Sequence, residues 1–345
     1  MDKFIPTKYH KFKCKKNIQN KMIHDGVLYL ARKKVVSAWN FETGALIWKT
    51  KIKHGCVERL FVFNCLPPGK NCQNYLVIQQ FMDDKLTILD LVDGHLLDTI
   101  GIQGCEPYED FDIMCIWGEY LVGINVMEAV FIVDKTFKII HLFDHDDFID
   151  AIICDDNLAL LSHKSDVGVY NNSFELVNEI VFAKCGESIK YSNGLFYTHL
   201  YDTVRIDGDG ITSMDDISVY DKKGTLIATH TINDIVDTFI VRNDHLFIST
   251  GDFVLVFNEG MMLGQLNYDI DNFLIYDDRL YLFRSGGRTM RLGEYFPQHF
   301  AKLTRSQHKL VDSWVTVRDK SNPLIHKDLS LLFCRELLCT GDIPR

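Results

Sequence analysis

Carboxylates recur at an equivalent place in several stretches of the sequence, immediately before alternating apolar residues that are expected to form strands. The stretches are VERLFV, FDIMCI, IDAIIC, VDTFIV and IDNFLI, and their acids are Glu58, Asp112, Asp150, Asp237 and Asp271. In a further run, ESIKY, Ser188 takes this place. Like charges brought together are costly unless they are solvated or matched by a cation, so their natural counterpart is a Lys/Arg-rich peptide or a metal ion. The alternative is that each acid only closes a turn.

A second group of acids lies in the polar stretch YDTVRIDGDGITSMDD, from Tyr201 to Asp216. Its Asp207-Gly-Asp209-Gly segment has residue types found in calcium loops, but the spacing does not fit an EF-hand. We therefore predict a flexible acidic loop. Because loops on rigid scaffolds often carry binding residues, Asp207 and Asp209 join the candidate partner-binding residues.

The sequence lacks the common catalytic and cofactor motifs. Its thirteen histidines show no HExxH spacing, and its ten cysteines include no CxxC pair. The Gly-Lys pair at Gly69 is not a phosphate loop, since Asn64 stands where the required first glycine would be. No nucleophile and base stand at a recognisable spacing. We predict no catalytic residue, no metal ligand and no cofactor, and therefore not an enzyme.

These acids must be positioned by a repeated unit of strands. A pattern of alternating apolar residues, a large apolar residue, Asp or Asn, and a turn recurs along the chain. Its apolar anchors are Trp39, Leu89, Val133, Tyr170, Tyr220, Phe257 and, in a degenerate copy, Leu292. The period-2 alternation predicts a strand in each copy, followed by an antiparallel hairpin partner and preceded by two further strands. The Asp or Asn after each anchor is expected to bond backbone amides of the turn.

Four antiparallel strands in each of seven units predict an all-β fold, a seven-bladed β-propeller over residues 24–303. The stretch AWNFETGALIWK resembles a WD repeat in which Trp39-Asn40 replaces the Trp-Asp pair, and it also resembles the repeat of quinoprotein-like propellers. The resemblance implies a fold and leaves the function open. It also implies that the five strand-associated acids ring one mouth of a central channel. Trp39 and Trp48 are expected to pack between blades.

The two ends of the chain differ from the repeats. Residues 1–23 form a basic N-terminal segment: either a localisation signal or nucleic-acid arm, or a solvated segment or edge strand. Residues 304–345 form an extension with a predicted helix, whose Leu329, Leu332, Phe333 and Leu337 follow helical spacing. Its SLLFCRELL invites comparison with the elongin-binding helix of a SOCS box, although Leu331 and Cys334 are three apart rather than four. Packing against the propeller is the alternative. One end is expected to complete the last blade.

Charge and composition restrict the partners. The net charge is −10, and beyond residue 21 the chain holds 30 basic against 46 acidic residues. An acidic body repels nucleic acid and anionic lipid and favours a basic partner. Because no apolar run suits a signal peptide or a membrane span, we expect a cytoplasmic protein with reduced thiols.

The sequence thus predicts a non-catalytic interaction scaffold that binds a protein or basic peptide through an acidic propeller face. It predicts no binding to nucleic acid or membrane. Two alternatives remain: an enzyme of the quinoprotein or propeller-hydrolase type, and a ubiquitin-ligase substrate receptor that acts through the C-terminal helix.

Overall fold

The structure is a computed structural model, and its described residues are largely β-strand. They are residues 8–12, 18, 20–53, 55–80, 85–104, 111–125, 129–143, 148–184, 186–200, 205–207, 210–212, 214–232, 234–242, 245–250, 253–258, 261–267, 272–276, 279–286 and 289–295. The chain divides into two compact units, one of residues 17–235 and one of residues 1–16 with 236–345. Each unit is built from four-stranded antiparallel sheets.

Among its described residues the unit of residues 17–235 contains five four-stranded sheets, each formed by one stretch of chain. The first sheet consists of β2 (Asn20–His24), β3 (Val27–Arg32), β4 (Val35–Asn40) and β5 (Leu46–Lys51). The second consists of β6 (Val57–Cys65), β7 (Gln73–Gln80), β8 (Lys85–Leu89) and β9 (Leu96–Gly101). The third consists of β10 (Phe111–Trp117), β11 (Tyr120–Asn125), β12 (Val130–Val133) and β13 (Ile139–Phe143). The others are β14 (Phe148–Cys154), β15 (Asn157–Ser162), β16 (Asp166–Tyr170) and β17 (Leu176–Val181); and β18 (Ser188–Ser192), β19 (Leu195–Leu200), β22 (Asp215–Asp221) and β23 (Leu226–Ile232).

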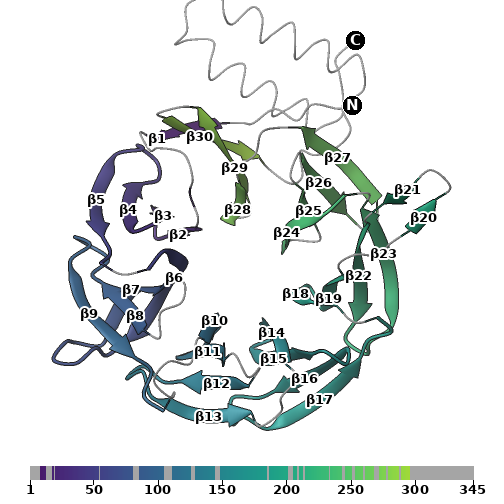
Figure 1. Cartoon of the computed structure of the whole chain (residues 1–345), viewed down its shortest axis with the longest axis horizontal. Helices are drawn as coiled ribbons and strands as arrows, with labels where there is room; N and C mark the ends of the chain where they lie inside the picture. Colours follow the sequence, from purple (N-terminus) through teal and green to yellow (C-terminus); the bar gives the residue numbers. More distant parts are fainter. Residues whose placement is uncertain are drawn as a thin grey trace, which may run out of the picture. The chain divides into compact units, whose positions relative to one another are not determined.

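Within this unit the first strand of each sheet lies on the inner side and the fourth on the outer side (Figure 1). The inner strands β2 and β6, β10 and β14, and β14 and β18 contact one another. The resemblance predicted this order of strands. Side chains of the inner strands are therefore brought together from successive sheets.

The part of the second unit that the structure describes contains two sheets. One consists of β24 (Val236–Arg242), β25 (His245–Thr250), β26 (Phe253–Asn258) and β27 (Met261–Asn267). The other consists of β28 (Asn272–Tyr276), β29 (Arg279–Gly286) and β30 (Thr289–Tyr295) with β1 (Lys8–Phe12), which pairs antiparallel with β30.

The pairing of β1 with β30 confirms the expectation that one end of the chain completes the last sheet, and it changes the expected boundaries of the basic segment and of the seventh unit. Six stretches of the chain supply complete four-stranded sheets, whereas the seventh supplies three strands and takes β1 as its fourth. The expected basic segment 1–23 therefore contributes β1 to one sheet and most of β2 to another. A lysine-rich strand can pair at an edge because the ladder is made by backbone hydrogen bonds. The predicted C-terminal helix lies outside the described residues.

After five of the anchors the Asp or Asn starts the turn between the third and fourth strands, as predicted. The side-chain oxygen Oδ1 accepts a hydrogen bond from the backbone N–H two or three residues later. These residues are Asn40, Asp90, Asp134, Asn171 and Asp221, with N to Oδ1 distances of 2.7 to 2.9 Å. A short side chain that replaces a missing backbone partner holds such a turn in place.

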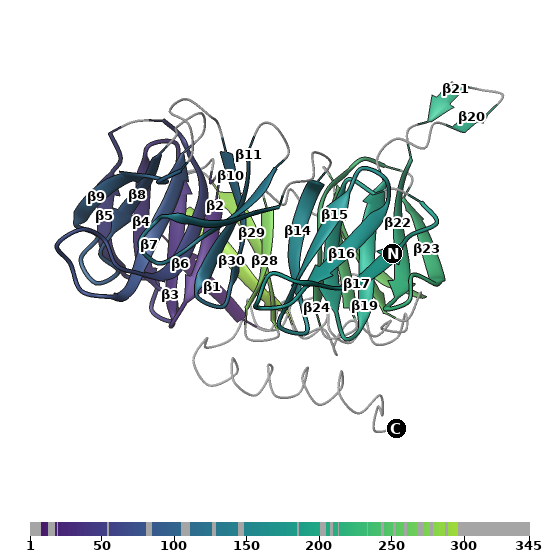
Figure 2. The same cartoon turned by 90° about the horizontal axis from the view of Figure 1, so that it is seen from below.

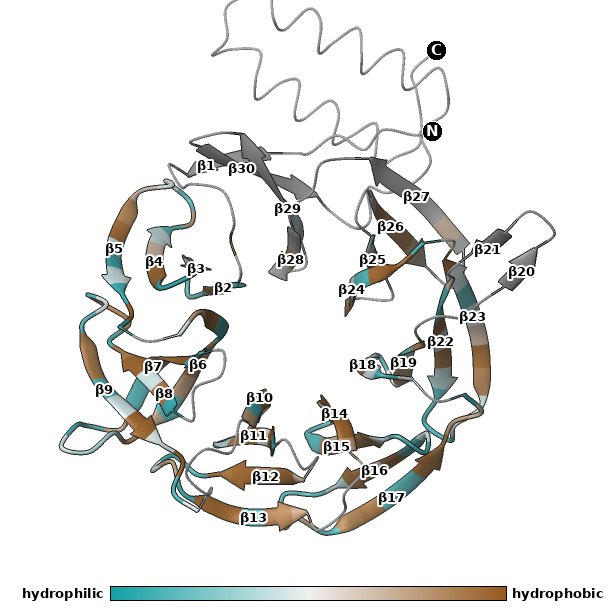
Figure 3. Cartoon of the chain, viewed as in Figure 1, coloured by the Kyte–Doolittle hydropathy of each residue, from teal (hydrophilic) through white to brown (hydrophobic). Residues whose placement is uncertain are grey.

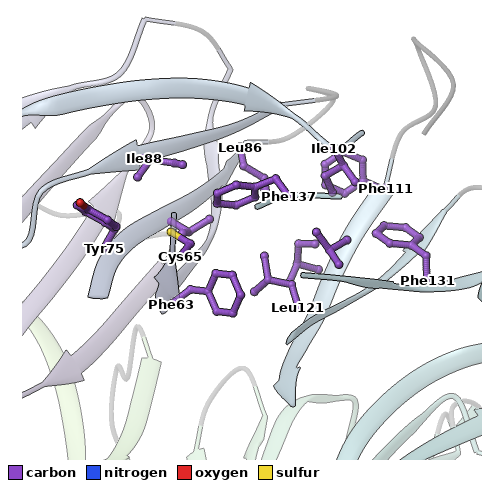
Figure 4. Close-up of a cluster of buried hydrophobic side chains, with 13 residues drawn as sticks. Phe63, Cys65, Tyr75, Leu86, Ile88, Ile102, Phe111, Leu121, Phe131 and Phe137 are labelled. Atoms are coloured by element: carbon purple, nitrogen blue, oxygen red, sulfur yellow. The ribbon is translucent and has the colours of Figure 1, made fainter. Parts of the chain in front are cut away.

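The hydrophobic core lies between neighbouring sheets. Figure 3 shows hydrophobic residues along middle strands such as β12 and β16. In one such layer Phe63 of β6 lies edge-on to Phe137, with ring centroids 6.3 Å apart, and Leu121 of β11 packs in the same cluster (Figure 4). Comparable buried clusters join the sheets that contain β2 and β6, β10 and β14, and β14 and β18. Because a sheet this small cannot bury both faces alone, the repeats stabilise one another.

Trp48 is part of such a layer, which confirms its predicted packing role. The indole is 7% exposed, and its Nε1 donates a hydrogen bond to the carbonyl of Leu91, 2.9 Å away, beyond β8 of the next sheet. Trp39 is also buried, and its Nε1 donates to Ser37 Oγ at 2.9 Å. Both tryptophans of the AWNFETGALIWK stretch therefore have structural partners.

The insert between Tyr201 and Asp216 differs from the expected loop. Arg205–Asp207 and Gly210–Thr212 form β20 and β21, a two-stranded hairpin that projects from its sheet (Figure 2). Asp215 and Asp216, which were assigned to the loop, are buried residues of β22. The sequence did not reveal the pairing of β20 with β21, because the insert is polar and the pairing depends on backbone hydrogen bonds rather than on apolar alternation.

Candidate functional site

The candidate site lies on the inner strands of the unit of residues 17–235. Glu58 is the second residue of β6, Asp112 the second of β10 and Asp150 the third of β14. The sequence placed these acids immediately before the strands, which is wrong: they are part of them. The strands begin earlier because Val57, Phe111 and Phe148 already pair with the neighbouring strand.

A β-bulge shapes the start of several inner strands. On β6 the pairing passes from Val57 to Arg59 and skips Glu58, and on β24 it passes from Val236 to Thr238 and skips Asp237. On β14 the skipped residue is Ile149, next to Asp150. A bulge changes the direction of the side chain at that point, and bulges are enriched next to functional sites.

Glu58 and Asp112 lie close enough to interact. The pKa of Glu58 is raised, first by burial and then by the negative charge of Asp112, while the charge of Arg59 opposes the rise. Asp112 Oδ1 accepts a hydrogen bond from Gln79 Nε2 at 2.8 Å, and Asp112 Oδ2 lies 3.9 Å from Arg59 Nη2. The Asp112 side chain remains 44% exposed. We call these two carboxylates, which lie beside the Arg59 guanidinium, the acidic pair.

Asp150 has a different environment and is 8% exposed. Its Oδ1 accepts the N–H of Ala151 at 2.9 Å, and its Oδ2 accepts the N–H of Ile189 at 2.8 Å, on β18 of the next sheet. Lys190 Nζ lies 3.8 Å from the same Oδ2. Asp150 therefore ties two sheets together, which favours the structural reading of this acid over a binding role.

A cavity of about 450 Å³ lies beside these residues. Met114 and Cys115 of β10 line it together with Ile149, Asp150, Ala151, Ile152 and Ile153 of β14, with Glu187, Ser188 and Lys190 at β18, and with Arg59 of β6. We call this cavity the inner-strand pocket. Burial raises the pKa of the Cys115 thiol to about 12, so the thiol is neutral near pH 7 and a poor nucleophile.

The other predicted site residues are not part of this group. Asp237 is an exposed residue of β24, in the second unit. Asp207 ends β20, and Asp209 and Asp271 lie outside the described residues. The structure therefore brings Glu58 and Asp112 together and places Asp150 on a neighbouring strand, and the convergence of all five strand acids stays a prediction.

Sequence reasoning missed the cations of this surface, Arg59 and Lys190. Both were visible as the residue after Glu58 and the residue two after Ser188, on the same inner strands. It also missed a buried pair in the sheet of β18, in which His199 Nε2 lies 3.0 Å from Asp215 Oδ2 and both side chains are 2% exposed. The pair joins β19 to β22 beneath the surface, so we give it no part in the site.

The described residues contain no group of three or more His, Cys, Asp or Glu side chains arranged to hold a metal ion. Nor does this part of the chain include a helix with the length and apolarity needed to cross a membrane.

Three solved structures that are similar to this chain are distant from it in sequence. BamB from Moraxella catarrhalis matches with a TM-score of 0.53 and 10% identity, over 81% of this chain and 85% of BamB. Raptor from Chaetomium thermophilum matches with a TM-score of 0.63 and 11% identity, over 84% of this chain and 28% of Raptor. The chain has a β-propeller fold. The computationally designed Ika8 protein also matches, with a TM-score of 0.54 and 9% identity over 85% of this chain and all of Ika8.

These matches confirm the predicted resemblance to WD-repeat and quinoprotein-like propellers as a resemblance of fold, so the four-stranded sheets are propeller blades. No protein-family model matches the chain, and no curated protein matches it in sequence. At about 10% identity the shared fold carries no function with it.

The raised pKa of Glu58 predicts a pH-dependent effect of Glu58→Gln on stability. A carboxyl whose pKa is higher in the folded chain favours folding below its ordinary pKa, and this contribution is lost as the pH rises through the folded value. Glu58→Gln should therefore raise the melting temperature at pH 7 and leave it unchanged near pH 4. Thermal denaturation across this range measures the difference, with Glu119→Gln in an exposed turn as the control. Identical pH profiles for both variants would contradict the assignment.

Proposed function

We propose that this protein is a non-catalytic interaction scaffold that binds a basic segment of a protein partner at the acidic pair, Glu58 and Asp112. The observation that carries the proposal is the proximity of these two carboxylates on adjacent inner strands. Burial and then the negative charge of Asp112 raise the pKa of Glu58, and a positive charge placed beside the pair would favour its charged form. The proposal takes the seven four-stranded sheets as seven blades, the number that the sequence repeats predict.

Three features support binding rather than catalysis. The acidic pair lies on strands, which hold side chains in place more firmly than loops do. The Cys115 thiol of the neighbouring inner-strand pocket has a raised pKa and is unsuited to nucleophilic attack. The net charge of −10 gives the chain a long-range attraction for cationic partners.

The acids outside the pair extend the proposal. Asp237, Asp271, Asp207 and Asp209 remain predicted contributors to an acidic face, whereas Asp150 is better explained by its bonds to Ala151 and Ile189. We place the protein in the cytoplasm in this proposal, with no nucleic acid or membrane as partner, because an acidic surface repels both.

Affinity capture with mass spectrometry tests the proposal. The bait is the full chain, compared with the double variant Glu58→Gln/Asp112→Asn. We expect partners with basic segments to be recovered by the wild type and to bind the double variant about tenfold more weakly at low salt, with a smaller difference as salt screens the charges. The measurement is the recovered amount of each partner at two salt concentrations.

The matched control is Glu119→Gln/Glu179→Gln, which removes two exposed charges outside the inner strands. It has the same net charge as the double variant, so it separates a local contact from the overall field. Equal recovery by the wild type and the inner-strand variant, or equal losses in both double variants, would reject the acidic pair as a binding site.

A further inference from the structure

The first sheet of the unit of residues 17–235 carries a concentration of positive charge. Between residues 27 and 57 the chain has six of the 30 basic residues found beyond residue 21, but only one of the 46 acids. The backbone N–H of Ile52 donates to the carbonyl of Lys34 at 2.7 Å, which brings the turn before β4 beside the end of β5. Four exposed bases meet there, and we call them the basic edge: Lys34, Lys49, Lys51 and Lys53.

The described carboxylates do not balance the basic edge. Among the residues that the structure describes, none of the four lysines is paired with an acid. Glu42 lies in the turn before β5, at the far end of the strand from the lysines. Asp93 adjoins Gly94, whose carbonyl accepts a hydrogen bond from Thr50 Oγ1, but the lysines of β5 project from the other face of the strand. Positive charges gathered in this way favour an anionic partner.

The strand β5 is also an unpaired edge of its sheet. It pairs with β4 on one side, and no described strand pairs with its other side, which lies outward in Figure 1. The pairing with β4 skips Ile47, a bulge at which Leu46 and Ile47 are 49% and 47% exposed. An edge strand presents unpaired backbone N–H and C=O groups that can bind an added strand. The edge therefore offers backbone groups, apolar contacts and positive charge along one strand.

Lysines on an edge strand can also serve only to prevent pairing between edges. This explanation covers Lys49 and Lys51 but not Lys34 and Lys53, which lie outside β5. The repulsion is selective as well. It disfavours a basic strand and favours one whose acids stand opposite the lysines, because opposite charges across an antiparallel pair attract each other.

We propose that β5 binds an extended acidic segment of a partner protein, which adds to the sheet as an antiparallel fifth strand. Side chains on one face of a strand recur at about 7 Å, so two acids separated by one residue would meet Lys51 and Lys49. Apolar residues after the acids would then cover Leu46 and Ile47. A polypeptide suits this edge better than a nucleic acid, because a phosphate backbone cannot pair with a strand. The surface is separate from the acidic pair and goes beyond the proposed function.

Fluorescence anisotropy with the full chain and labelled peptides tests the proposal. The probes are the Glu peptide Thr-Glu-Thr-Glu-Thr-Val-Val-Thr, the Gln peptide Thr-Gln-Thr-Gln-Thr-Val-Val-Thr and the Pro peptide Thr-Glu-Pro-Glu-Thr-Val-Val-Thr. We expect the Glu peptide to bind at low salt about tenfold more tightly than the Gln peptide, the effect of two cross-strand charge pairs. The Pro peptide keeps both acids but lacks one backbone N–H, so it should also bind about tenfold more weakly than the Glu peptide.

Two double variants locate the effect. Lys49→Gln/Lys51→Gln should remove the preference for the Glu peptide over the Gln peptide. The control is Lys70→Gln/Lys135→Gln, which makes the same change of charge at two exposed lysines outside the first sheet. Because all four side chains are exposed, both variants should keep the melting temperature of the wild type, and this is measured first.

Each outcome decides for or against the basic edge. Equal binding of the Glu and Pro peptides would reject strand addition, and equal losses in the two double variants would reject the basic edge as the site. If the Glu peptide does not bind, the proposal is overturned, and binding of a labelled oligothymidylate in its place would assign the patch to nucleic acid. None of these results depends on Glu58 or Asp112, so the proposed function is tested separately.

Discussion

Gly94→Ala is expected to lower the free energy of unfolding by about 3 kcal/mol, the sum of backbone strain and overpacking. Gly94 has a φ of +70°, in the left-handed region that favours glycine. A Cβ at this position would overlap the indole of Trp48 and lie 2.9 Å from Thr50 Oγ1. Trp48 is buried and bonded to Leu91, so it cannot move aside without breaking the layer between two blades. Urea denaturation of the wild type and the variant measures the loss.

Gly69→Ala is the matched control. Gly69 also has a φ of +70°, but a Cβ there would meet nothing within 4 Å. Its substitution should cost only the strain of the left-handed conformation, about 1 kcal/mol. Equal losses in the two variants would show that the Trp48 layer tolerates the methyl group and would contradict the packing argument.

Asp150→Ala is expected to lower the free energy of unfolding by about 3 kcal/mol, because it leaves buried donors without an acceptor. The N–H groups of Ala151 and Ile189 would lose the carboxylate, and Lys190 would lose its nearby anion. The bond to Ile189 joins two blades, so its loss weakens the contact between β14 and β18. The change in urea midpoint is the measurement.

Two Asp-to-Asn variants refine this test. In Asp150→Asn the amide keeps one acceptor oxygen, so about half of the loss should remain. Asp112→Asn should change stability by less than about 1 kcal/mol, because the Asp112 carboxylate is 44% exposed and bonded to Gln79. If Asp150→Ala were as mild as Asp112→Asn, Asp150 would return to the binding residues and its structural role would be rejected.

Much of the fold was predictable from local sequence. Alternation of apolar residues located the strands because the side chains of a strand point to opposite sides at a period of two. The Asp and Asn residues after the anchors, such as Asn40 and Asp134, marked turns because their short side chains bond the nearby amides. Both patterns depend on neighbours in the chain, so one sequence sufficed to read them.

The hairpin β20–β21 and the pairing of β1 with β30 were harder to locate. The hairpin consists of two three-residue strands in a polar insert, where alternation gives no guidance. The sequence left open which end of the chain completes the last blade, since β1 and β30 are separated by nearly the whole chain. Such pairing depends on where the other blades bring the two strands.

The candidate site, like the fold, has features that the local sequence predicts and features that only the packing of the blades sets. The sequence by itself determined that acids occur at equivalent places of successive inner strands, and it predicts that the acidic chain favours a basic partner. Only the tertiary structure decided that the charge of Asp112 acts on Glu58, and that Asp150 accepts a hydrogen bond from the N–H of Ile189. It also decided that Arg59 and Lys190 line a pocket beside these acids. The reason is physical: a charge acts according to its distance from other charges and its burial, and both are set by how separate blades pack together.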